Sequence, residues 1–161
     1  HLEHRRQRQM CIRDRFCPVE ELRAAGAPVG LGVDGSSSND SSNLMQELRQ
    51  AYLLQRLRRG AEQFSHIDAL ELATTEGARL LNRDDIGEIR EGACADLALF
   101  STDELRFAGA HDPLAALVLS GAHRAEAVMV NGEWKVRNGE LVDVDLEEIL
   151  ESQKKAAVAL V

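Results

Sequence analysis

The chain has 161 residues, and its 19 basic and 27 acidic residues give a net charge of −8 at neutral pH. An apolar fraction of 44% and a charged fraction of 29% are typical of a globular protein of about one domain. No apolar run approaches the roughly 20 residues of a membrane span, and the acidic balance argues against a nucleic-acid-binding surface. We therefore expect a cytoplasmic protein with neither a membrane nor a nucleic acid as partner.

The first fifteen residues fit nothing that follows them. Five arginines against two acidic residues give this stretch a charge of +3, and it lacks the apolar core of a signal peptide. A basic arm for nucleic acid is one interpretation, but the acidic remainder offers no matching surface. We expect residues 1–15 to be a non-native or disordered leader, with native sequence beginning near Phe16 or Cys17. Three scattered cysteines, Cys11, Cys17 and Cys94, predict reduced thiols rather than a disulfide framework.

An apolar run at 29–33 ends abruptly at Asp34, and a Gly- and Ser-rich loop then leads into a predicted helix at 44–59. This order predicts a buried strand, a loop and a helix, as in a parallel sheet. Ligands bind at the carboxyl ends of such strands, so Asp34 is a candidate for chemistry. Asp-Gly is also a turn sequence, and spacing alone favours the turn. One strand makes no sheet, so its partners must come from elsewhere.

Capping residues and helix breakers mark the other predicted helices. The first two are expected at 18–26 and at 44–59, the second capped by Ser42 or Asn43. Two more are expected at 67–76, begun by Ser65 or Asp68, and at 78–81, after an interruption at Gly77. A helix at 114–119 begins with Asp112-Pro113, and a final helix begins after Asp143 or Asp145, with Leu146, Ile149 and Leu150 facing inward.

Two Asn-Gly pairs give the clearest β signal, because Asn-Gly is the preferred sequence of type I′ hairpin turns. They separate three predicted short strands at 127–130, 133–137 and 140–142. Further strands are expected at 86–89 and, buried, at 95–100.

Four stretches in this order resemble the amidohydrolase superfamily of metal-dependent deaminases. Residues 32–49 resemble the last barrel strand and its helix, residues 69–81 the next helix, residues 86–100 the entry to a small β domain, and residues 112–134 most resemble the branch of 8-oxoguanine deaminases and hydroxyatrazine-type aminohydrolases. The resemblance covers roughly residues 18–142.

The resemblance implies a (β/α)8 barrel with one Zn²⁺ ion at its carboxyl end. In such enzymes zinc generates hydroxide from bound water, and a carboxylate relays the proton toward the leaving ammonia. Asp34 matches the family's metal-side Asp, which makes it both a metal ligand and the catalytic base and favours a functional role over a turn. Ser36 or Asn39 would lie near the substrate ring, although helix capping is their alternative role.

The sequence departs from the family in its histidines. His1, His4, His66, His111 and His123 form no His-x-His pair, and each is expected to be a surface or capping residue. The other four metal positions and the usual catalytic Glu have no match, and a whole barrel needs about 250 residues. The predicted fold class is therefore α/β. Residues 16–85 are expected to form the C-terminal part of a (β/α)8 barrel, and residues 86–142 the late helix and strands of a composite β-sandwich domain. Residues 143–161 are expected to form a C-terminal helix and tail.

The expected function is that of the C-terminal portion of a zinc-dependent aminohydrolase acting on C–N bonds other than peptide bonds. It would release ammonia from a purine-like, 8-oxoguanine-like heterocycle, be inactive alone, and belong to a full-length enzyme that could form a homo-oligomer. The alternatives are a non-catalytic interaction module or one chain of a split enzyme. Backbone N–H groups of the loop beginning at Gly35 could also bind phosphate, although no Walker lysine is present.

Overall fold

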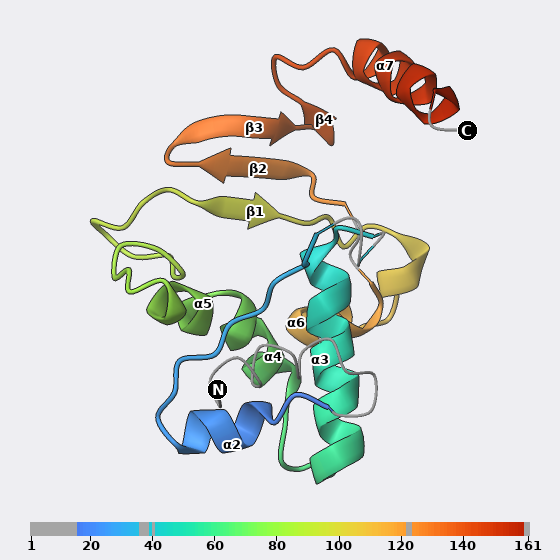
Figure 1. The fold of residues 1–161 in the computed structure, drawn as a ribbon. Coiled ribbons are helices and arrows are strands. Elements are labelled where there is room, and N and C mark those ends of the chain that lie inside the picture. Colours follow the sequence, from blue (N-terminus) through green and yellow to red (C-terminus); the bar gives the residue numbers. More distant parts are fainter. Residues whose placement is uncertain (1–15, 36–38, 40, 122–123, 160–161) are drawn as a thin grey trace, which may run out of the picture.

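The computed structural model describes residues 16–35, 39, 41–121 and 124–159. The predicted leader at 1–15, Ser36 and His123 lie outside these residues. The helices are α2 (Val19–Ala24), α3 (Leu44–Arg59), α4 (His66–Ala73), α5 (Thr75–Leu80), the 3₁₀ turn η1 (Leu105–Phe107), α6 (Pro113–Leu119) and α7 (Leu146–Val158). The strands are β1 (Leu97–Leu99), β2 (Ala127–Val130), β3 (Glu133–Arg137) and β4 (Glu140–Leu141). The predicted α/β class is thus confirmed, with helices α2 to α6 on one side of a small sheet and α7 beyond it (Figure 1).

Helix starts follow the predicted capping chemistry. The Asn43 side chain accepts hydrogen bonds from the N–H groups of Met45 and Gln46 at the start of α3, and Asp112 does the same for Leu114 and Ala115 at α6. Ser65 and Asp68 do not compete for the start of α4. They form the two halves of one capping box.

The main core lies among α2, α3, α4 and α6. Its buried side chains are Val19, Leu48, Phe64, Ala69, Leu72 and Val118. Half-buried Val29 and Leu31 pack against this cluster, so the apolar segment before Asp34 is anchored to the helices. A smaller cluster joins Phe107 of η1 to Ala116 of α6.

The predicted strand at 29–33 is wrong as a secondary-structure assignment. Residues 27–35 belong to no strand, and the Leu31 N–H donates to the carbonyl oxygen of Leu72 in α4 at 3.2 Å. None of the described strands pairs with residues 29–33, so this run joins no ladder. Gly30 instead allows close contact with α5, since a Cβ there would lie 3.1 Å from the Gly77 Cα.

The predicted helix break at Gly77 is also misplaced. The chain breaks at Thr74, whose φ and ψ are −128° and −96°, and Gly77 lies within α5. Gly77 therefore does not end a helix, and it is the absence of a Cβ at Gly30 that lets the two backbones approach closely. The short strand expected at 86–89 is absent as well, because these residues form bends and irregular backbone.

The sheet has the order β1-β2-β3-β4, and all neighbouring strands are antiparallel. Both Asn-Gly turns are confirmed, with positive φ at Asn131, Gly132, Asn138 and Gly139 as type I′ turns require. The Asp96 carboxylate accepts the Asn131 N–H at 2.6 Å and ties the first turn to the chain before β1. The buried strand expected at 95–100 is wrong in its burial, because β1 is short and mostly exposed.

The inward orientation predicted for α7 is wrong. Leu146, Ile149 and Leu150 are all about half exposed, and α7 contains no buried residue. Asp145 rather than Asp143 caps the helix. Within the described part of the chain, no helix combines the length and apolar character needed to cross a membrane.

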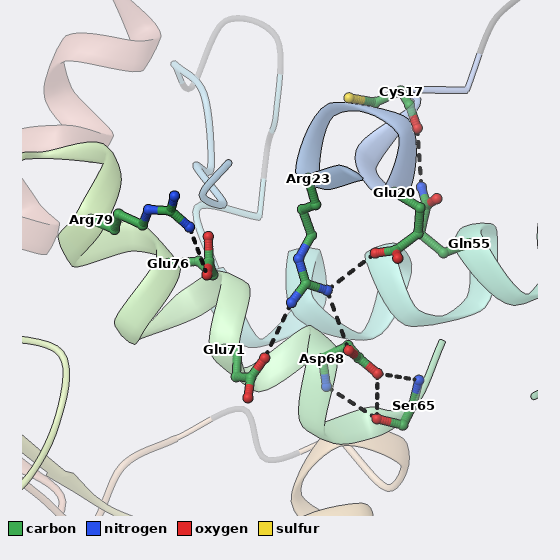
Figure 2. A network of polar contacts seen from close by, with 9 residues as sticks. All are labelled: Cys17, Glu20, Arg23, Gln55, Ser65, Asp68, Glu71, Glu76 and Arg79. Atoms are coloured by element: carbon green, nitrogen blue, oxygen red, sulfur yellow. Dashed lines mark hydrogen bonds and ion pairs between the residues drawn. The ribbon is translucent and has the colours of Figure 1, made fainter. Parts of the chain in front are cut away.

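One arginine joins α2 to α4. The Arg23 guanidinium contacts the carboxylates of Glu20, Asp68 and Glu71 at 3.1, 3.2 and 3.3 Å (Figure 2). Partial burial would raise the pKa of Asp68, but hydrogen bonds from the Ser65 hydroxyl and N–H, together with Arg23, hold that pKa below its usual value. The network therefore favours a charged Asp68 and links the N-terminal helix to the core.

Candidate functional site

Asp34 lies at the end of the anchored apolar segment. It is exposed, its φ is +61°, and its Oδ1 accepts the Gly35 N–H at 2.8 Å. A left-handed backbone is uncommon for a residue other than glycine and is most tolerated by Asn and Asp. Asp34 therefore combines the two features that the sequence predicted, a turn conformation and a position at the end of the apolar segment. The hydrogen bond to the Gly35 N–H orients its carboxylate within this turn.

The loop after Asp34 folds back on the start of α3. The Asn39 Nδ2 donates to Glu47 Oε1 at 2.6 Å, and the Asn39 Oδ1 accepts from both the N–H and the hydroxyl of Ser41. Asn39 thus holds the loop to the helix. The suggested contact of Ser36 with a substrate, and most of the suggested phosphate-binding loop, concern residues outside the described ones.

The described part of the chain contains two of the five histidines, His66 and His111. His66 is the first residue of α4, and its Nε2 lies 3.2 Å from Asp112 Oδ2. His111 is exposed in the loop before α6. Hydrogen bonds from the Ala115 and Leu114 N–H groups, with the nearby His66, hold the pKa of Asp112 below its usual value. His66 and Asp112 therefore join the starts of α4 and α6, whereas the cap of α4 itself is Ser65.

The described residues do not form a complete metal site. Among the described residues, no group of three or more His, Cys, Asp or Glu side chains could hold a metal ion. A zinc site needs at least three protein ligands with nitrogen, sulfur or oxygen donors. These residues alone do not fit a zinc site, and Asp34 is the single candidate ligand that the sequence predicted.

One polar cluster was missed by the sequence analysis. Arg83 contacts Asp85 through two nitrogens, at 2.8 and 2.5 Å, and the Cys94 thiol donates to the same carboxylate at 3.2 Å. The hydrogen bond to Asp85 raises the pKa of Cys94, so this thiol is a poor nucleophile. The contact joins residues nine positions apart across a turn, and no periodic signal in the sequence marks it.

A hollow of about 600 Å³ lies beside this cluster. Its lining includes Arg79, Arg83 and Arg90, which could suggest an anion site. Each of these arginines already contacts a carboxylate, on Glu76, Asp85 and Glu88 respectively. Asp34 does not line this hollow. Because the arginines of the hollow are already paired with carboxylates, Asp34 remains the candidate functional residue.

Comparison with known proteins gives a consistent result. The model of the "Amidohydrolase family" matches residues 2–135. An 8-oxoguanine deaminase of Pseudomonas aeruginosa is 55% identical over 152 residues, which cover 94% of this chain and 34% of that protein. The chain thus spans about a third of the length of this curated relative.

Two solved structures are similar in fold as well as sequence. The atrazine chlorohydrolase of Arthrobacter aurescens TC1, complexed with zinc, gives a TM-score of 0.81 at 37% identity, covering 87% of this chain and 32% of that one. An adenosine deaminase of Xanthomonas campestris with bound zinc gives 0.82 at 29% identity, covering 91% and 34%.

Proposed function

Because this chain belongs to the amidohydrolase family, we propose that it is the C-terminal part of a hydrolytic deaminase that releases ammonia from a purine-like heterocycle of the 8-oxoguanine type. The observation that carries the proposal is the 55% identity to an 8-oxoguanine deaminase over 94% of the chain. In the complete enzyme, residues 16–85 would belong to a (β/α)8 barrel and residues 86–142 to a small β domain. The enzyme would act in the cytoplasm.

Asp34 is the residue of this chain proposed to take part in the reaction. Deamination adds the oxygen of water to the ring carbon that bears the amino group, and the carbon–nitrogen bond then breaks. A carboxylate only accepts hydrogen bonds when ionised, so it can take a proton from the attacking water and deliver it to the leaving amine. The packing of Val29 and Leu31 against the core supports a fixed position for this group.

Zinc is supported by the two zinc-bound structural relatives. We propose that Asp34 supplies one ligand to a single zinc ion and that the remaining ligands come from outside the described residues. The chain alone would then bind zinc weakly and turn over no substrate.

A chimera tests this proposal. This chain would replace the matching 152-residue segment of the Pseudomonas aeruginosa 8-oxoguanine deaminase, and ammonia release from 8-oxoguanine would be measured. We expect an active chimera, and we expect Asp34→Asn to lower its kcat at least about 100-fold, the usual scale for loss of a general base. Asp103→Asn, a change at an exposed carboxylate, is the control and should leave turnover unchanged. Near-normal turnover in Asp34→Asn, with Asp103→Asn equally active, would exclude Asp34 from the mechanism.

One chain of a split enzyme is the second candidate. It is supported by the exposed apolar side chains of the sheet, including Leu99, Val130 and Leu141, which a partner chain could cover. Activity that appears on mixing this chain with the remaining part of the relative, expressed separately, would favour this candidate.

A further inference from the structure

The last helix carries an apolar stripe that nothing in the described structure covers. Leu146, Ile149 and Leu150 are spaced three and four residues apart, so they lie on one face of α7. Each is about half exposed. Figure 1 shows α7 beyond β4, on the opposite side of the sheet from helices α2 to α6. An amphipathic helix in this position has an apolar face available to a partner.

The charges of α7 are divided along its length. Its first half carries Glu147, Glu148 and Glu151, and its second half carries Lys154 and Lys155. Glu147 and Lys154 are seven residues apart, close to two helical turns, so both lie along the same edge of the apolar stripe. This distribution is self-complementary only when two such helices run in opposite directions.

We propose that α7 is a docking surface for α7 of a second copy of this chain, with the two helices antiparallel about a two-fold axis. Lys154 contacts Glu151 of its own helix at 2.9 Å. In the proposed arrangement Glu147 of each copy faces Lys154 of the other, which then lies between two carboxylates, while the apolar stripes meet between the helices. Such a contact is isologous, as the symmetry of a two-fold dimer requires. The antiparallel direction also places the negative end of each helix dipole beside the positive end of the other.

A parallel pair would bring the two acidic halves together and the two basic halves together, so the charge pattern favours the antiparallel pair over the parallel one. A helix of 13 residues is only about 20 Å long, so the contact is small and its dimer is weak. Leu141 and Val144, just before the helix in the chain, are also exposed. The inference does not depend on the proposed deaminase activity.

Charge reversal with complementation tests the proposal by sedimentation velocity on the full chain over a concentration series. We expect the unmodified chain to dimerise, and we expect Glu147→Lys and Lys154→Glu each to raise the dimer Kd about tenfold, because each places like charges together. An equimolar mixture of the two variants should recover the dimer, since opposite charges then meet in the heterodimer. Lys135→Glu, the same change of charge on β3, is the matched control and should leave the Kd unchanged.

Circular dichroism would verify that each variant keeps its helix, and Leu150→Ala provides a second variant that weakens the dimer without changing charge. A monomeric chain at every concentration would overturn the proposal. Self-association that both reversals leave unchanged, or that mixing does not restore, would also overturn it. A monomer in which the amides of α7 are protected from exchange would assign the stripe to a segment of the same chain instead, which equally contradicts a second copy.

Discussion

The helical region (α2 to α6) and the C-terminal region (β1 to β4 and α7) differ in what they bury. The fully buried side chains Leu48, Phe64, Leu72 and Val118 all belong to the helical region. In the C-terminal region, none of the described strand residues and none of the residues of α7 is buried. Both regions have well-marked turns and caps, so the comparison shows that regular secondary structure does not by itself create a core.

This difference has an energetic consequence. Burial of apolar surface is the dominant favourable term in folding, at about 25 cal/mol per Å². The helical region buries apolar side chains of its own. The sheet depends instead on the hydrogen bonds of its ladder and on cross-strand pairs such as Val128 with Val136, each worth roughly 0.2–1 kcal/mol. We therefore expect the two regions to respond differently to matched substitutions.

The largest expected difference is between two leucines. Leu72→Ala should lower the free energy of unfolding by about 2–5 kcal/mol, because Leu72 is fully buried in α4 and its loss leaves a cavity. Leu141→Ala in β4 should cost less than about 1 kcal/mol, because that side chain is half exposed. Urea denaturation of both variants measures the difference. Equal losses would mean that β4 is covered in solution.

A smaller effect is expected at the link between α2 and α4. Asp68→Asn should cost about 1 kcal/mol at neutral pH, because it removes the charge from the capping box and from the Arg23 contact. The pKa of Asp68 is lowered in the fold, so the wild-type chain should lose this contribution as pH falls below about 4, where the unfolded carboxyl begins to bind protons. The stability gap between the two proteins should therefore close in acid. Asp103→Asn is the control, and a gap that stays constant with pH would contradict the role given to Asp68.

The smallest effect on the global free energy of unfolding is expected in the first hairpin. Gly132 has a φ of +83°, so Gly132→Ala should cost about 1–2 kcal/mol locally. Because the sheet buries no side chain, the change should appear as faster amide exchange in β2 and β3, with the unfolding midpoint of the helices unchanged. Gly32→Ala, at a glycine with open space and no positive φ, should affect neither measurement. A shifted midpoint in Gly132→Ala would show that the sheet and the helices unfold together.

Much of the fold could be predicted where the signal is local. Asn43, Ser65 and Asp112 cap the helices that they were expected to begin, and both Asn-Gly pairs make the expected turns. The candidate site was less accessible to prediction. Its one predicted residue, Asp34, lies at the end of the apolar segment, but the backbone contact between Gly30 and Gly77 that positions this segment joins residues 47 positions apart, and a single sequence carries no signal for such a pair.

The sequence by itself determined where α3, α4 and α6 begin and where both hairpins turn, because caps and turn residues act on backbone groups within a few positions. Only the tertiary structure decided that residues 29–33 pack on α4 and α5 without joining a ladder, that the helix breaks at Thr74, and that the apolar face of α7 stays exposed. An apolar pattern predicts that one face of an element is buried, but it does not identify the segment that packs against that face. Burial therefore depends on partner segments distant in the chain or outside it, and three-dimensional packing alone assigns them.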